Sequence, residues 1–259
     1  MTKDLYLPDG LNLITCDHID STNEEAKRLT QKGATHGTVV WAQTQGTGRG
    51  RRGRSWVSEP GNLFCSLIVK PERPLAEASQ LSFVMAVSVA DALCSIDVKT
   101  MRPIQCKWPN DILIGGRKVA GILLETVTGS QNKLDSVIAG VGINIEHFPE
   151  STEFPATSLH AEGIQDTTAA SVLESVCAQL SKWYAVWETE GFQGIRAAWL
   201  EKAFGLGGPI HVRLPSATHS GVFEALDPTG ALIINENGTR RHIAAGDVYF
   251  DEATLQNVV

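Results

Sequence analysis

The sequence is short of several features that would assign it to a specialised class. Its five cysteines are scattered without a Cys-x-x-Cys pair, at Cys16, Cys65, Cys94, Cys106 and Cys177. This odd count and spacing argue against a disulfide framework and a zinc site, and indicate reduced thiols in a cytoplasmic protein. No run of about 18 uncharged apolar residues is present, as a membrane span requires. The first ten residues, MTKDLYLPDG, lack the apolar core of a signal peptide.

Positive charge is scarce as well. The chain has 22 Lys and Arg against 29 Asp and Glu, which gives a formal net charge of −7. This balance disfavours general binding to nucleic acid, although a local basic patch could still bind it. There is no internal repeat and no low-complexity tail. The hydrophobic content of 42% is ordinary for a soluble globular chain of 259 residues, which is long enough to bury a substantial core.

What is present is a series of strand-like and helix-like segments, which predicts an α+β fold. The strands are predicted at 11–18, 37–43, 62–70 and 133–146, with three more inside 104–125 around the turns Pro109-Asn110-Asp111 and Gly115-Gly116. The helices are predicted at 24–33, 79–96, 167–190 and 192–204.

The pattern of residues along the sequence changes after residue 205. Turn-forming residues gather in Gly205-Leu-Gly-Gly-Pro209, and short β runs alternating with turns follow them. We therefore predict a domain at 1–205 and a second at 206–259. About fifty residues of short strands indicate a small β-barrel for the second domain.

Four arginines and four glycines are concentrated in GTGRGRRGRSW, residues 46–56, here called the basic loop. Gly48, Gly50 and Gly53 formally match a dinucleotide fingerprint, but no helix opens at the third glycine, and the region about 20 residues further on, Glu72-Arg73-Pro74, is a probable turn. A P-loop is excluded because no Gly-Lys-Ser/Thr follows. Guanidinium groups and close backbone approach remain, and they favour an anionic ligand. The alternative is a solvated basic loop.

Two further segments carry polar groups where the backbone is expected to be rigid. Lys107 ends an apolar strand before a Trp-Pro turn, so its ammonium can meet a carboxylate or phosphate oxygen; an ordinary exposed turn lysine is the alternative. Asp111 is favoured as a turn residue or anchor over a catalytic base. The hydroxyls of Ser21 and Thr22 at a helix start either cap that helix, with Glu25 completing a capping box, or bind a polar ligand.

The segments DSTN, TQGTGRGRRGRSW, KWPNDILIGGRKVAGILLE and GVGINI, in that order and spacing, resemble the biotin protein ligases over nearly the whole chain. The resemblance implies a catalytic domain of mixed sheet and helices, shared with lipoate ligases and related to class II aminoacyl-tRNA synthetases, followed by an SH3-like barrel. Some members carry an N-terminal helix-turn-helix domain and repress transcription. DSTN begins here at residue 20, so we expect a ligase that is not such a repressor.

The resemblance also implies a reaction. Biotin and ATP, with Mg²⁺, would give biotinyl-5′-adenylate and pyrophosphate, and a lysine of a biotin carboxyl carrier domain of acetyl-CoA carboxylase or a related carboxylase would then take the biotin. Lys107 and Arg51 are the expected catalytic residues, and no resident metal site is expected. The residues expected at biotin are Ser21, Thr22, Asn23, Gln45, Arg49, Gly50, Arg51 and Lys107. Those expected at the nucleotide are Arg51, Arg52, Trp56, Lys107, Asn110, Lys118 and Asn144.

Other interpretations stay open at this point. Trp56 and Trp108 either pack against the ligands and the basic loop or belong to the core. A lipoate or octanoate transferase of the same fold is the nearest alternative function, and a non-catalytic nucleic-acid-binding protein is the remote one, which predicts steep salt dependence. A monomer and a homodimer are both compatible with the sequence.

Overall fold

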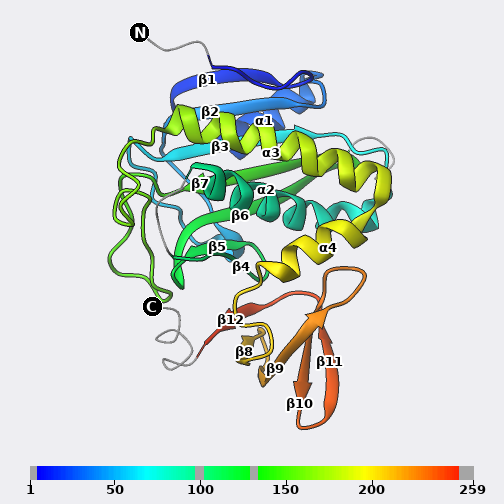
Figure 1. Ribbon diagram of the computed structural model, residues 1–259. Helices are drawn as coiled ribbons and strands as arrows, with labels where there is room; N and C mark the ends of the chain where they lie inside the picture. The colour runs from blue at the N-terminus through cyan, green and yellow to red at the C-terminus, as the bar shows by residue number, and fades with distance from the viewer. Residues whose placement is uncertain (1–4, 97–101, 129–133, 251–259) are drawn as a thin grey trace.

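The computed structural model describes residues 5–96, 102–128 and 134–250. Its centre is a seven-stranded sheet in the order β1-β2-β3-β7-β6-β5-β4. Figure 1 shows this sheet with β1 at the top and β4 at its lower edge. Strands β1 and β2 run parallel, and every other neighbouring pair is antiparallel. The strands are β1 (Asn12–Ile19), β2 (Thr38–Gln45), β3 (Leu63–Val69), β4 (Ile104–Lys107), β5 (Asp111–Ile114), β6 (Arg117–Thr128) and β7 (Leu134–Ile143).

Helices cover both faces of this sheet. Helix α1 (Thr22–Gln31) places Ala26 against Val40, Ile68 and Ile138 on one face. The main core lies on the other face, under α2 (Leu81–Ile96) and α3 (Ala169–Glu190), which pack against each other. The segment 76–96, which begins within the short 3₁₀ helix Leu75–Gln80, is long and apolar enough to cross a membrane, but 67% of the residues in its most apolar stretch are buried within the fold. Its composition is therefore that of a core helix.

The C-terminal part is a second, antiparallel sheet in the order β11-β10-β9-β8-β12, drawn in orange and red in Figure 1. Its strands are β8 (Pro209–Arg213), β9 (Thr218–Leu226), β10 (Leu232–Glu236), β11 (Thr239–Ile243) and β12 (Asp247–Tyr249). No pairing joins β11 to β12 in the described residues, so the expected barrel is not closed. Strand β12 is three residues long and pairs with β8 at the edge of this sheet.

Aromatic side chains join the two sheets. Trp199 of α4 (Phe192–Glu201) is fully buried, with its ring 5.6 Å from that of Phe83 on α2 and 6.4 Å from that of Phe223 on β9. The buried indole of Trp108 donates a 3.1 Å hydrogen bond to the carbonyl of Gly230, in the β9–β10 turn. These contacts fix the C-terminal sheet beside the Trp-Pro turn that follows β4.

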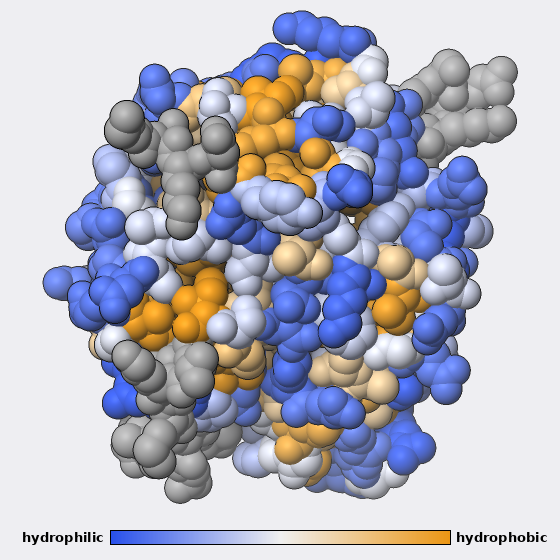
Figure 2. All heavy atoms as spheres, turned by 45° about the horizontal axis from the view of Figure 1, so that its top comes forward, coloured by the Kyte–Doolittle hydropathy of each residue, from blue (hydrophilic) through white to orange (hydrophobic). Residues whose placement is uncertain are grey.

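The predicted elements are all found, with ends shifted by a few residues, because each has a clear periodicity. The prediction of a capping box at the start of α1 is wrong. Ser21 is the N-cap and its side chain makes no capping hydrogen bond, while Thr22 is already inside the helix. On the surface, large exposed apolar residues come from separate segments, and Figure 2 shows apolar patches interspersed with polar side chains. These residues are Tyr6, Ile14, Val57, Phe148, Leu206 and Val222.

Candidate active site

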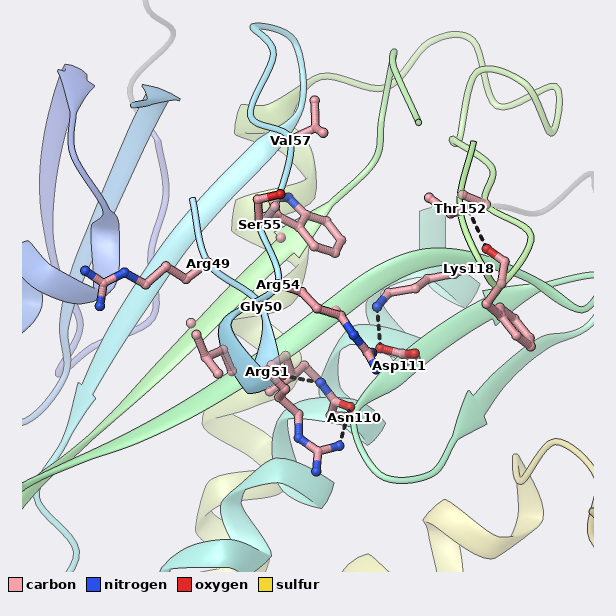
Figure 3. Close-up of a pocket in the computed structure, with 18 of the residues that line it drawn as sticks. Arg49, Gly50, Arg51, Arg54, Ser55, Val57, Asn110, Asp111, Lys118 and Thr152 are labelled. Atoms are coloured by element: carbon pink, nitrogen blue, oxygen red, sulfur yellow. Dashed lines mark hydrogen bonds and ion pairs between the residues drawn. The ribbon is translucent and has the colours of Figure 1, made fainter. Parts of the chain in front are cut away.

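A cavity of about 400 Å³ opens between the β6–β7 surface, the basic loop, the 147–156 loop and strand β12. Every predicted site residue except Arg52 lines it. Figure 3 labels five of them, Arg49, Gly50, Arg51, Asn110 and Lys118. The residues brought together are Ser21, Thr22, Asn23, Gln45, Arg49, Gly50, Arg51, Trp56, Lys107, Asn110, Lys118 and Asn144. Four sequence motifs therefore meet at a single concave site, which is where ligands usually bind.

The basic loop is folded as a short hairpin over the cavity. The amide of Trp56 donates to the carbonyl of Gly48 at 2.9 Å, and the amide of Gly50 donates to the carbonyl of Arg54 at 2.7 Å. The tip is left-handed, with φ of 55° at Arg52 and 74° at Gly53. These two hydrogen bonds close the loop as a hairpin, and Arg52, at its left-handed tip, does not line the cavity.

The glycines of this hairpin differ in their surroundings. A Cβ on Gly48 would lie 2.4 Å from the carbonyl oxygen of Trp56 and 2.5 Å from the hydroxyl of Ser58. Gly50 has φ −111°, and the nearest atom to a Cβ there would be 3.5 Å away. Gly48, rather than Gly50, is therefore the position where the backbone requires glycine.

The arginines of the loop have different partners. Arg51 is half-buried and donates from Nη1 to Oδ1 of Asn110 at 3.1 Å, as Figure 3 shows. Arg49 pairs with Glu24 of α1 at 2.9 Å. Arg52 and Arg54 both bind Asp247 of β12. The loop is therefore attached to both domains, and Arg51 is the arginine aimed at the turn after Lys107.

Trp56 lies on the floor of the cavity. Cβ atoms built on Gly121 and Gly142 would come within 2.9 and 2.5 Å of its indole. These two paired glycines on β6 and β7 leave the space that the ring fills. Trp108 is instead a core residue, only 3% exposed. The sequence left the same two alternatives for both tryptophans; the structure places Trp56 in the cavity and Trp108 in the core.

Two lysines converge on one carboxylate at the end of the cavity. The Lys118 Nζ is 2.6 Å from Oδ1 of Asp111, and the Lys107 Nζ is 3.6 Å from Oδ2. Burial lowers the pKa of Lys107, although the Asp111 charge opposes this shift. Burial alone would raise the pKa of Asp111, but the charges of Lys118 and Lys107 lower it. Asp111 is therefore an ionised anchor, as the turn position favoured, and not a free base.

The other end of the cavity is a connected polar cluster at the start of α1. Gln45 Oε1 accepts from the amide of Thr22 at 2.9 Å and from its hydroxyl at 3.1 Å. The buried Ser66 hydroxyl lies 2.7 Å from the Thr22 hydroxyl and 2.6 Å from Oδ1 of Asn23. Asn23 also donates to Glu125 at 2.7 Å. The hydroxyl and amide groups are thus held by one another instead of capping the helix.

Asn110 and Asn144 line the cavity with side chains that also bind backbone. Asn110 donates from Nδ2 to the carbonyl of Ile122 at 2.6 Å, which fixes the turn after Lys107 against β6. Asn144 is buried and donates to the carbonyl of Thr157 at 3.0 Å. Both amides therefore shape the site whether or not they touch a ligand.

Several lining residues were not predicted from the sequence. Arg54 lies within the basic loop, Glu153 and Phe154 come from the irregular segment 147–166, and Asp247 and Tyr249 come from β12. The Phe154 ring centroid is 4.2 Å from the Lys107 Nζ. Only Arg54 lay in a motif, and nothing local marks the others, because their positions depend on pairings distant in the chain.

Comparison with known proteins agrees with this geometry. The Biotin/lipoate A/B protein ligase family matches residues 15–144, and the Biotin protein ligase C terminal domain matches residues 205–251. The chain is 38% identical to a biotin–[acetyl-CoA-carboxylase] ligase of Paracoccus denitrificans, over 89% of this chain and 97% of that protein. It is 34% identical to the bifunctional ligase/repressor BirA of Bacillus subtilis, over 92% of this chain and 74% of that one.

Solved structures show the same relationship. A biotin protein ligase from Aquifex aeolicus in complex with biotin and ATP superimposes with a TM-score of 0.77, at 30% identity, over 92% of this chain and 97% of that one. The ligand-free structure of biotin protein ligase from Aquifex aeolicus gives a TM-score of 0.75 at 26% identity, over 93% of this chain and 100% of that one. This chain belongs to the biotin/lipoate A/B protein ligase family and, within it, to the biotin protein ligases.

Proposed function

We propose that this protein activates biotin with ATP to biotinyl-5′-adenylate and transfers the biotinyl group to a lysine of a biotin carboxyl carrier domain. The observation that carries this conclusion is the convergence of the four motifs on one cavity, with a polar cluster at one end and two lysines at the other. The relatives named as biotin–[acetyl-CoA-carboxylase] ligases and the biotin- and ATP-bound relative agree with it.

The polar cluster suits the head of biotin. A ureido ring presents one carbonyl acceptor and two N–H donors, so it needs donors and acceptors fixed close together. Ser21, Thr22, Asn23 and Gln45 supply hydroxyl and amide groups of both kinds, and the first three are buried. We assign these four residues to the ureido ring. Arg49 and Gly50 would belong to the loop that covers it.

The lysine end suits the adenylation step. A carboxylate oxygen of biotin attacks the α-phosphorus of ATP, a new C–O–P link forms, and the bond to pyrophosphate breaks. Negative charge gathers at the phosphorus centre in the transition state, where fixed cations in a site shielded from water act strongly. Lys107 is only 7% exposed, and Arg51 approaches from the basic loop. We assign both to this charge.

The remaining assignments concern the nucleotide and its metal. We place Lys118, Asn110, Asn144 and Trp56 near the nucleotide, and Arg52 remains a more distant candidate. No three His, Cys, Asp or Glu side chains among the described residues gather as a metal site. Magnesium would therefore enter with ATP, held mainly by phosphate oxygens, as this ion commonly is. It would shield the triphosphate charge.

In the second step the carrier lysine attacks the carbonyl carbon of the mixed anhydride, an amide bond forms, and AMP leaves. The amine must give up a proton. Asp111 is committed to two lysines, so we do not assign that proton to it. The role proposed for Asp111 is to hold Lys107 and Lys118 apart and oriented.

We propose that the enzyme works in the cytoplasm as a ligase without sequence-specific DNA binding. The basic loop is the main cluster of positive charge in the sequence, and three of its arginines are already paired with Glu24 or Asp247. Paired arginines are poorly placed to neutralise DNA phosphates. Specific binding to DNA at nanomolar concentration in moderate salt would contradict this part.

The function is tested by transfer to a carrier. Purified protein, biotin, MgATP and a biotin carboxyl carrier domain are combined, and the carrier is analysed by intact mass and peptide mapping. We expect one biotinyl group on one lysine, and none on a carrier whose acceptor lysine is replaced by arginine. A folded enzyme that leaves the carrier unmodified would contradict the proposal.

A further inference from the structure

Side chains of both loops that flank the cavity bind residues of strand β12 in the C-terminal sheet. Asp247, only 9% exposed, accepts from Arg52 Nη1 at 2.8 Å and from Arg54 Nη2 at 2.5 Å. A buried carboxylate is stable only when it is paired, so these two arginines and Asp247 hold each other in place. This contact attaches the basic loop to β12.

The 147–156 loop is attached two residues farther along the same strand. The Tyr249 hydroxyl donates to Oε2 of Glu153 at 3.0 Å. The Arg213 guanidinium binds Oε1 of Glu153 at 2.7 Å and stacks 4.1 Å from the centroid of the Tyr249 ring. Arg213 is the register partner of Asp247 on β8, so the two attachments share one pair of strands.

The second attachment reaches the reacting end of the cavity. Phe154 follows Glu153, and its ring lies over the Lys107 ammonium at 4.2 Å. The same ring contacts Phe250, just after β12, at 6.4 Å. The position of β12 therefore affects what covers Lys107 as well as the position of the basic loop.

We infer that β12 couples the two loops, with Asp247 and Tyr249 as positioning residues on one strand. Side chains two apart on a strand lie on the same face, so a shift of β12 that loosens one loop also loosens the other. Thermodynamic reciprocity then requires that each loop stabilise its counterpart. If the attachments were independent surface ion pairs, breaking one would leave the other loop unchanged.

Limited trypsin digestion tests the coupling without relying on activity. The basic loop offers trypsin Arg49, Arg51, Arg52 and Arg54, and cleavage of a locally opened segment reports how often it opens. Glu153→Gln should increase cleavage within 49–54 by about two- to fivefold, although Glu153 is on the other loop. Glu150→Gln makes the same charge change on that loop and should cleave as the unsubstituted protein does.

Two further variants complete the digestion experiment. Asp247→Asn should increase cleavage at least as much as Glu153→Gln, and Tyr249→Phe, which removes only a hydroxyl, should also increase it. Equal cleavage of Glu153→Gln, Tyr249→Phe and the unsubstituted protein would overturn the coupling. Equal acceleration by Glu150→Gln would also overturn it, because charge alone would then be responsible. Cleavage spread over the whole chain identifies a variant that has lost its fold, and the comparison then uses Tyr249→Phe.

The kinetic consequence rests on the proposed function and is measured separately. In biotin-dependent ATP–pyrophosphate exchange, Glu153→Gln should raise the KM for biotin by about two- to fivefold with a smaller change in kcat. Arg240→Gln breaks an exposed pair with Glu224 in the same sheet and should leave the KM unchanged. An unaltered KM for Glu153→Gln would contradict the coupling. No exchange by the unsubstituted protein would refute the function while leaving the digestion result valid.

Discussion

Lys107 and Asp111 are register partners at the turn end of the β4–β5 hairpin, with Nζ and Oδ2 3.6 Å apart. The Lys107 side chain is buried and that of Asp111 largely so, and Lys118 approaches the same carboxylate from β6. Their position is set by backbone pairing and by the Asn110 bond to β6. The charges can therefore be altered one at a time in a frame that is held by other contacts.

Replacing Lys107 by alanine should reduce adenylate formation severely. The change removes a fixed cation from the phosphorus centre, which costs about 10²- to 10³-fold in kcat when a comparable charge-stabilising group is lost. Asp111 keeps Lys118 as a partner, so the circular dichroism spectrum should be unchanged. Pyrophosphate exchange is the assay, and the exposed Lys32→Ala is the matched control. Near-normal exchange by Lys107→Ala would refute the role assigned to Lys107.

The pH profile of adenylation should show the burial of Lys107. The charged lysine exists below its pKa, so activity is lost as pH rises through that value. Because burial lowers the pKa of Lys107, this alkaline limb should lie below the ordinary lysine range near about 10.4. Asp111→Asn removes the charge that opposes the shift, so its limb should move to still lower pH. Asp9→Asn, at an exposed position, serves as the control. A shift of the alkaline limb to higher pH in Asp111→Asn would contradict the assignment of this limb to Lys107.

The two glycines of the hairpin should respond differently to alanine. A methyl group on Gly48 meets the Trp56 carbonyl and the Ser58 hydroxyl, whereas one on Gly50 meets only ordinary contacts. Overpacking of this kind costs about 1–3 kcal/mol, which corresponds to roughly 5- to 150-fold in affinity if the loop must rearrange. Biotin binding by calorimetry should therefore weaken for Gly48→Ala and change less than about threefold for Gly50→Ala. The reverse order would show that the hairpin is not the binding conformation.

The contact between the two sheets should dominate the stability of the protein. Trp199→Ala empties a fully buried site that touches Phe83 and Phe223, and such a change costs about 3–5 kcal/mol of the free energy of unfolding. Urea denaturation measures it. Trp183→Ala, at a half-buried position whose indole bonds to Asp91, is the comparison and should cost less. Equal losses would mean that Trp199 does not join the two parts as described.

The sequence predicted most of the fold because the elements are locally encoded. Short apolar segments bounded by turn residues marked the strands, and the Gly-Gly and Pro-Asn-Asp turns fixed the hairpins around Lys107. The site residues were predicted through the resemblance of four motifs to the biotin protein ligases, and Ser21, Gln45, Lys107 and Lys118 all reach one cavity.

What the sequence did not predict depends on distant partners. Arg52 does not line the cavity but pairs with Asp247, a lining residue 195 positions away, and no local pattern indicates that contact. Thr22 seemed a capping residue because helix starts favour hydroxyls, but Gln45 and Ser66 compete for its hydroxyl. Within the described residues the expected barrel is not closed, since β12 pairs with β8 and not with β11.

The most direct test of the central claim is ATP–pyrophosphate exchange by the purified protein with magnesium, with biotin, lipoate or octanoate supplied separately. We expect exchange with biotin and none with the other two acids. Exchange with lipoate or octanoate but not with biotin would contradict the substrate while keeping the adenylation chemistry. No exchange with any of the three acids, from protein shown to be folded, would contradict the proposed adenylation reaction itself.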